Sequence, residues 1–145
     1  MVRLVFGQPK HGWLPLTLHV DEFELALDAS DVPINPLDEL CNSLCLVLKG
    51  GDASVWWHLE PAWYQFHLEP KLSEVVLSIY QASRYQRPDL KIFQYTGDFN
   101  SIVLPFYRAL KQFVSLPTPE SSWPSTDEGK LRELTALVRA RKSEY

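Results

Sequence analysis

Histidine and glutamate recur together in one short segment of this sequence, residues 55–69. The tripeptide His-Leu-Glu occurs there twice, at residues 58–60 and 67–69, and three of the five tryptophans lie in the same stretch. Imidazole and carboxylate groups are common zinc ligands and common general acids and bases. The segment therefore raises two chemical possibilities, a metal site and acid–base catalysis.

We predict that residues 55–69 form a β-hairpin, and its register determines which of these side chains are neighbours. If Pro61 and Ala62 form a two-residue turn, His58 lies opposite Gln65 and His67 lies opposite Trp56, so the two histidines are diagonal neighbours. Alternation then gives an outward face with Trp56, His58, Glu60, Trp63, Gln65, His67 and Glu69. We expect the opposite face to pack in the core, with Val55, Trp57, Leu59, Tyr64, Phe66 and Leu68.

The segment by itself completes neither a zinc site nor a catalytic site. A zinc centre needs a third or fourth donor, which Glu60, Glu69 or His19 would have to supply. The sequence lacks nucleotide-binding, nucleophile-elbow, metalloprotease and Cys-x-x-Cys motifs. We therefore favour a non-enzymatic protein and assign no catalytic residue, no metal ligand and no cofactor. A small-ligand or metal-dependent enzyme using His58, His67 and Glu60 is the alternative.

The outward face of the hairpin has the composition of a protein-binding surface. Aromatic anchors beside polar groups are typical of interface hot spots. The candidate binding residues are Trp56, His58, Trp63, Gln65 and His67. A helix covering this face would bury the same residues without any partner, and the sequence leaves that open.

The remaining elements predict an α+β fold. Strands are predicted at 3–6, 14–20, 23–27, 74–81 and 90–96, besides the two of the hairpin. A turn at Asp21 and Glu22 places His19 opposite Glu24, and Pro15 predicts an edge strand or a bulge. Helices are predicted at 35–49 and 102–115. We expect a mainly antiparallel, twisted sheet of about six strands, with these two helices packed on one face and an additional C-terminal helix.

The domain organisation follows from composition along the chain. Residues 1–115 are expected to form a single α+β domain, 116–126 a Pro/Ser-rich strap, and 127–145 a helix that packs on the same domain or on a second protomer. Trp123 is expected to anchor the strap, with a partner contact as the alternative, and Thr126 to cap the last helix. Cys41 and Cys45, one helical turn apart, are expected to be core residues.

Length and charge exclude several classes of protein. A chain of 145 residues fits one globular domain. Its net charge of -4 disfavours a general nucleic-acid binder. The sequence lacks an apolar run near the roughly 20 residues that cross a bilayer and begins without a signal-peptide pattern. We expect a cytoplasmic protein with no nucleic-acid or membrane partner.

The layout resembles that of small α+β immunity proteins of bacterial polymorphic-toxin systems. The resemblance covers residues 13–115 and rests on the order of elements and on segments such as Val-Trp-Trp-His-Leu-Glu-Pro from Val55 and Leu-Pro-Phe-Tyr-Arg-Ala-Leu from Leu104. It implies a stoichiometric binder that blocks a cognate toxin, and the acidic balance suits a basic partner. A homodimer that uses the exposed sheet face as its interface is a further alternative.

Overall fold

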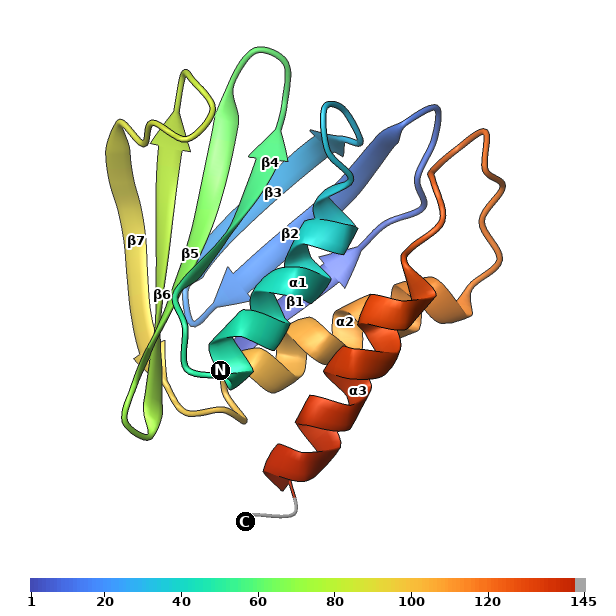
Figure 1. Ribbon diagram of the computed structural model, residues 1–145. Coiled ribbons are helices and arrows are strands. Elements are labelled where there is room, and N and C mark those ends of the chain that lie inside the picture. Colours follow the sequence, from blue (N-terminus) through green and yellow to red (C-terminus); the bar gives the residue numbers. More distant parts are fainter. Residues whose placement is uncertain (143–145) are drawn as a thin grey trace.

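The computed structural model describes residues 1–142 and contains one antiparallel sheet whose seven strands lie in chain order (Figure 1). The prediction of an α+β fold is confirmed, with seven strands in place of about six. The strands are β1 (Val2–Phe6), β2 (Trp13–Val20), β3 (Phe23–Ser30), β4 (Ala53–His58), β5 (Trp63–Lys71), β6 (Glu74–Ala82) and β7 (Leu90–Gly97). The helices are α1 (Pro36–Leu48), α2 (Val103–Ser115) and α3 (Glu128–Lys142). Within the described residues, no helix combines the length and apolar composition needed to cross a membrane.

The first hairpin has the predicted register. Val20 pairs with Phe23, and His19 pairs with Glu24. The prediction that Pro15 marks an edge or a bulge is wrong, because β2 lies between β1 and β3. Pro15 lies beyond the last residue that β1 pairs with, and its carbonyl accepts a hydrogen bond from the Gly7 N–H at 2.8 Å. An inner strand tolerates proline there, because β1 has already ended on the side where the missing N–H would point.

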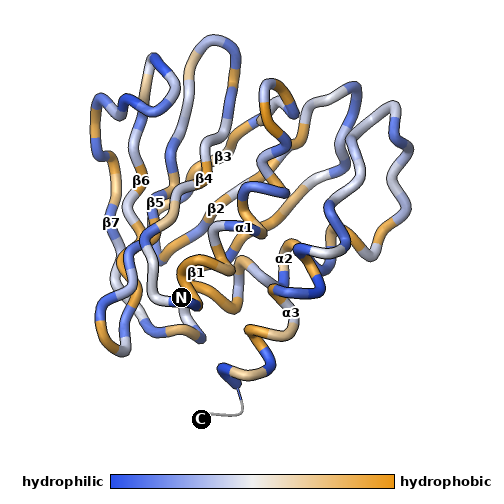
Figure 2. Tube along the Cα trace, viewed as in Figure 1, coloured by the Kyte–Doolittle hydropathy of each residue, from blue (hydrophilic) through white to orange (hydrophobic). Residues whose placement is uncertain are grey.

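The core lies between the sheet and the helices. The helices lie on one side of the sheet (Figure 1), α1 and α2 contain hydrophobic residues (Figure 2), and buried residues of both helices share one cluster with residues of the strands. Trp57 and Phe66 are fully buried there, as the predicted hairpin alternation requires, and Phe106 of α2 is fully buried beside them. Cys41 and Cys45 are buried free thiols in the same core, and burial raises the pKa of Cys41 to about 12.

The strap and α3 are bound to the body at several points. Trp123 is 2% exposed, so it anchors the strap, and the Gly12 N–H donates to the Ser122 carbonyl at 2.8 Å. α3 lies against α1, with Leu134 and Val138 buried. Asp127, rather than Thr126, caps α3, since its Oδ1 accepts from the Lys130 N–H at 3.1 Å.

The sheet is nearly interrupted between β3 and β4. These strands share a single pair, Ser30 with His58. On the edge opposite β5, the rest of β4 lies beside α1 instead of a strand, and α1 supplies polar side chains to its backbone. The Glu39 carboxylate accepts the Trp56 N–H, and the Ser43 hydroxyl donates to the Ser54 carbonyl at 2.9 Å. Residues 39 and 43 lie one helical turn apart on the same face of α1. Their spacing is similar to that between the backbone groups of Ser54 and Trp56, two residues apart on β4.

Burial of Glu39 has an electrostatic consequence. Desolvation raises the pKa of the Glu39 carboxyl, and the hydrogen bond from the Trp56 N–H partly opposes that rise. The charged form is therefore less favourable in the folded protein than in the unfolded chain. The Glu39 contribution to stability is largest at acidic pH and is lost as pH rises through the raised pKa.

Two substitutions of Glu39 separate its charge from its hydrogen bond. Glu39→Gln keeps an acceptor for the Trp56 N–H, whereas Glu39→Ala leaves that buried donor unpaired. We expect the alanine variant to have a free energy of unfolding about 1–3 kcal/mol below that of the glutamine variant at pH 7, measured by urea titration. Relative to Glu39→Gln, the wild type should lose stability as pH rises from the acid range. Equal stability of the two variants would contradict the role of the hydrogen bond.

Candidate functional site

The central hairpin has a register two residues away from the predicted one. His58 pairs with Trp63, Trp56 with Gln65, and Ser54 with His67. The connection is the four residues 59–62 instead of the two-residue turn Pro61-Ala62, and the Leu59 N–H donates to the Ala62 carbonyl at 2.8 Å. Proline has a fixed negative φ, whereas the first central residue of a two-residue hairpin turn needs a positive one. Glu60 takes the positive value instead, with φ at 54°.

This register separates the two histidines. A shift of two residues keeps every side chain on its predicted face, but His58 and His67 are no longer diagonal neighbours and cannot share an ion. His58 stacks on Trp63 with ring centroids 4.0 Å apart, and its Nδ1 lies 2.7 Å from the Val32 carbonyl oxygen. Glu60 is exposed in the connection. The set His58, His67 and Glu60 is therefore not assembled.

Trp56 and Trp63 form an aromatic cluster on the outer face of the sheet. Their rings meet edge to face at 6.2 Å, and Tyr85 from the β6–β7 connection stacks on Trp63 at 4.8 Å. Trp56 is 9% exposed and Trp63 is 8% exposed. The connection that carries Tyr85 thus covers much of the predicted binding face, and of the five candidate residues His58, Gln65 and His67 remain partly accessible.

His67 belongs to a different group of side chains, which we call the His67 cluster: Asp52, His67 and Glu69. One ligand atom from each lies within 4.8 Å of the others. His67 and Glu69 project from the same face of β5, and Asp52 comes from the connection between α1 and β4. The sequence-based set missed Asp52 because it precedes the strand and has no place in the alternation. His19 is on β2 opposite Glu24 and is not in the cluster.

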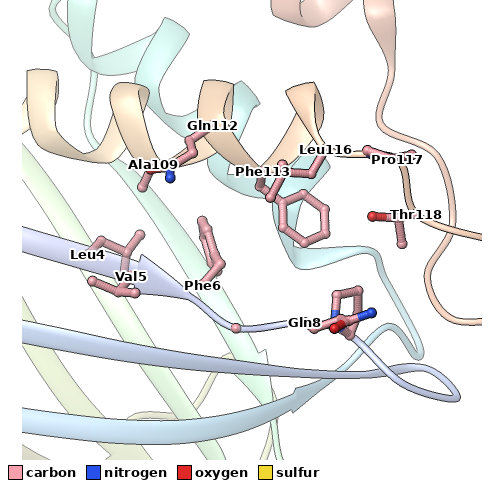
Figure 3. A pocket seen from close by; sticks show the side chains of 12 residues that line it. Leu4, Val5, Phe6, Gln8, Ala109, Gln112, Phe113, Leu116, Pro117 and Thr118 are labelled. Atoms are coloured by element: carbon pink, nitrogen blue, oxygen red, sulfur yellow. The ribbon is translucent and has the colours of Figure 1, made fainter.

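An apolar groove lies beside β1, the strand at the edge of the sheet. This β1 groove has a volume of about 350 Å³ and lies between the end of β1, the last turns of α2 and the start of the strap (Figure 3). Phe6 and Phe113 meet in it edge to face at 5.7 Å. Val5 and Leu116 line it with 42% and 59% of their surface exposed. The sequence alone did not reveal the groove, because its walls are about 100 residues apart in the chain.

The segments that line the β1 groove carry a net charge opposite in sign to that of the whole protein. Segments 1–20 and 99–119, which supply most of the lining, contain no Asp or Glu. They carry Arg3, Lys10, Arg108 and Lys111, all exposed. The two segments that line the groove are thus basic, on a chain whose net charge is -4.

Comparison with known proteins adds only a likeness in layout. No family model matches the sequence, and no curated protein matches it. Among solved structures, the chain is similar to one described as a CdiA-CT/CdiI toxin and immunity complex from Enterobacter cloacae. The two share 16% identity with a TM-score of 0.48, over 77% of this chain and 99% of the other. A similarity of this size concerns the backbone layout alone.

Removal of Tyr85 tests whether the aromatic cluster is covered. In Tyr85→Ala we expect tryptophan emission to shift to longer wavelength and acrylamide quenching to increase, because Trp56 and Trp63 lose their cover. Loss of two aromatic contacts should lower the free energy of unfolding by about 1–2 kcal/mol. Tyr80→Ala is the matched control on the same sheet, since Tyr80 contacts Lys91 instead of a tryptophan. Unchanged quenching in Tyr85→Ala would show that the cluster is not shielded by this loop.

Proposed function

We propose that this chain is a non-enzymatic protein-binding protein that takes an extended segment of its partner in the β1 groove. The observation that carries the proposal is the groove itself, an accessible apolar surface beside the open edge of the sheet. Val5 and Leu116 are large apolar side chains that stay exposed in it. Exposed apolar surface next to an unpaired strand is typical of sites that receive another chain.

The backbone of β1 supports an extended partner. The Gly7 N–H points toward β2, where it bonds the Pro15 carbonyl, and the Val2 N–H points the other way, where it bonds the Ser101 carbonyl at 2.8 Å. Because alternate residues of a strand point to opposite sides, the N–H and C=O groups of Leu4 and Phe6 face away from β2. An added strand would use these groups, while apolar side chains would fill the groove.

The local charge indicates the chemistry of that segment. The segments that line the groove, within residues 1–20 and 99–119, carry four exposed basic side chains and no Asp or Glu. A partner segment with apolar side chains flanked by Asp or Glu is complementary to this surface. We further propose that the partner is a toxin, which this protein inhibits by binding it, as the resemblance to immunity proteins implies.

The outer face of the hairpin stays a second proposed contact surface. Its accessible members, His58, Gln65 and His67, are polar, and its two tryptophans are nearly buried. Interface energy usually comes from accessible aromatic or apolar anchors. We therefore rank the β1 groove above this face.

Charge substitutions at the groove test the proposal. The binding partner used as the probe is the protein encoded by the adjacent gene. Val5→Asp and Leu116→Asp should each weaken binding in calorimetry by tenfold or more, about 1.4 kcal/mol. Leu90→Asp is the matched control, because Leu90 is 57% exposed and lies on β7, the opposite edge strand. Equal loss in the control, or no binding by the wild type, would contradict the proposal.

A further inference from the structure

We propose that the His67 cluster binds a divalent transition-metal cation, a role independent of the proposed protein-binding function. One ring nitrogen of His67 and one carboxylate oxygen each of Asp52 and Glu69 lie within 4.8 Å of one another. The Nε2 atom lies 3.8 Å from Asp52 Oδ2. Each donor therefore needs only a small side-chain movement to reach the separations found in a coordination shell, where metal–ligand distances are about 2.0–2.2 Å.

A second observation is the hydrogen-bonded chain behind the imidazole. The His67 Nδ1 lies 2.8 Å from Ser54 Oγ, and that oxygen accepts a hydrogen bond from Gln65 Nε2 at 2.9 Å. When Nδ1 carries the proton and donates it to Ser54, Nε2 presents its lone pair to the two carboxylates. A histidine that binds a metal is typically held in this way through its other ring nitrogen. Neither Ser54 nor Gln65 is a proposed metal ligand. Their hydrogen bonds therefore orient the His67 ring without taking part in coordination.

The donor set determines which cations fit. One imidazole nitrogen with two carboxylate oxygens suits zinc, cobalt, nickel or manganese, whereas calcium and magnesium prefer oxygen ligands alone. Water would complete the shell, because His67 is 28% exposed, Glu69 39% and Asp52 60% at their side chains. The bound cation would join the α1–β4 connection to β5.

Lys71 disfavours cation binding at the cluster, so its substitution should change the metal affinity in the opposite direction from substitution of a ligand. Its ammonium lies 3.7 Å from Glu69 Oε1, where it competes with a cation for the same carboxylate. Removal of that charge by Lys71→Gln should tighten metal binding. Removal of a donor by His67→Ala or Asp52→Asn should weaken it, and Ser54→Ala should weaken it through the orientation of the ring.

Titration of the full chain with Zn²⁺ by calorimetry, and with Co²⁺ by visible absorption, tests the proposal. We expect one equivalent to bind, with affinity at least tenfold weaker in His67→Ala and about tenfold weaker in Ser54→Ala. Lys71→Gln should bind more tightly, and His58→Ala should match the wild type, because His58 lies outside the cluster. Circular dichroism spectra confirm that each variant folds. No binding at about millimolar Zn²⁺, or equal losses in His58→Ala and His67→Ala, would overturn the proposal.

Discussion

The fold depends on how the backbone of β4 is satisfied where the sheet nearly divides. Buried N–H and C=O groups need partners, and β3 provides only one residue pair for β4. α1 supplies partners for two further groups from one helical face, with Glu39 as acceptor for the Trp56 N–H and Ser43 as donor to the Ser54 carbonyl. Burial removes water from the Glu39 carboxylate, and this desolvation raises the pKa of Glu39. An unpaired strand N–H in the same place would cost about 1–3 kcal/mol, and the helix provides the acceptor that a neighbouring strand would otherwise supply.

This arrangement also determines where accessible surface remains. The sheet bends around the helices, and its two edge strands are β1 and β7 (Figure 1). α2 and the strap then meet β1 and leave an apolar groove along it (Figure 3). On the outer face, the connection with Tyr85 covers the tryptophans. The same connection leaves the His67 cluster partly accessible.

Local rules predicted the elements better than the contacts between them. The β2–β3 register follows from alternation around Asp21-Glu22, and α1 starts where the sequence predicts, with Asn35 as its N-cap. The β4–β5 register was wrong because proline conformation, rather than loop length alone, decides the turn. Hairpin alternation still identified the buried face, since a two-residue shift preserves it. The role of Glu39 was not predictable, because the first turn of any helix favours a carboxylate, and Asp52 and the β1 groove depend on tertiary contacts.

Hydrogen exchange of the Trp56 amide tests the central claim most directly. If the Glu39 carboxylate replaces a strand neighbour, the Trp56 N–H exchanges slowly in NMR spectra of the wild type, and Glu39→Ala removes that protection while other β4 amides retain theirs. The Leu4 and Phe6 amides are the internal reference, because they lie on the open edge of the same sheet. Exchange of the Trp56 amide as fast as theirs would contradict the account.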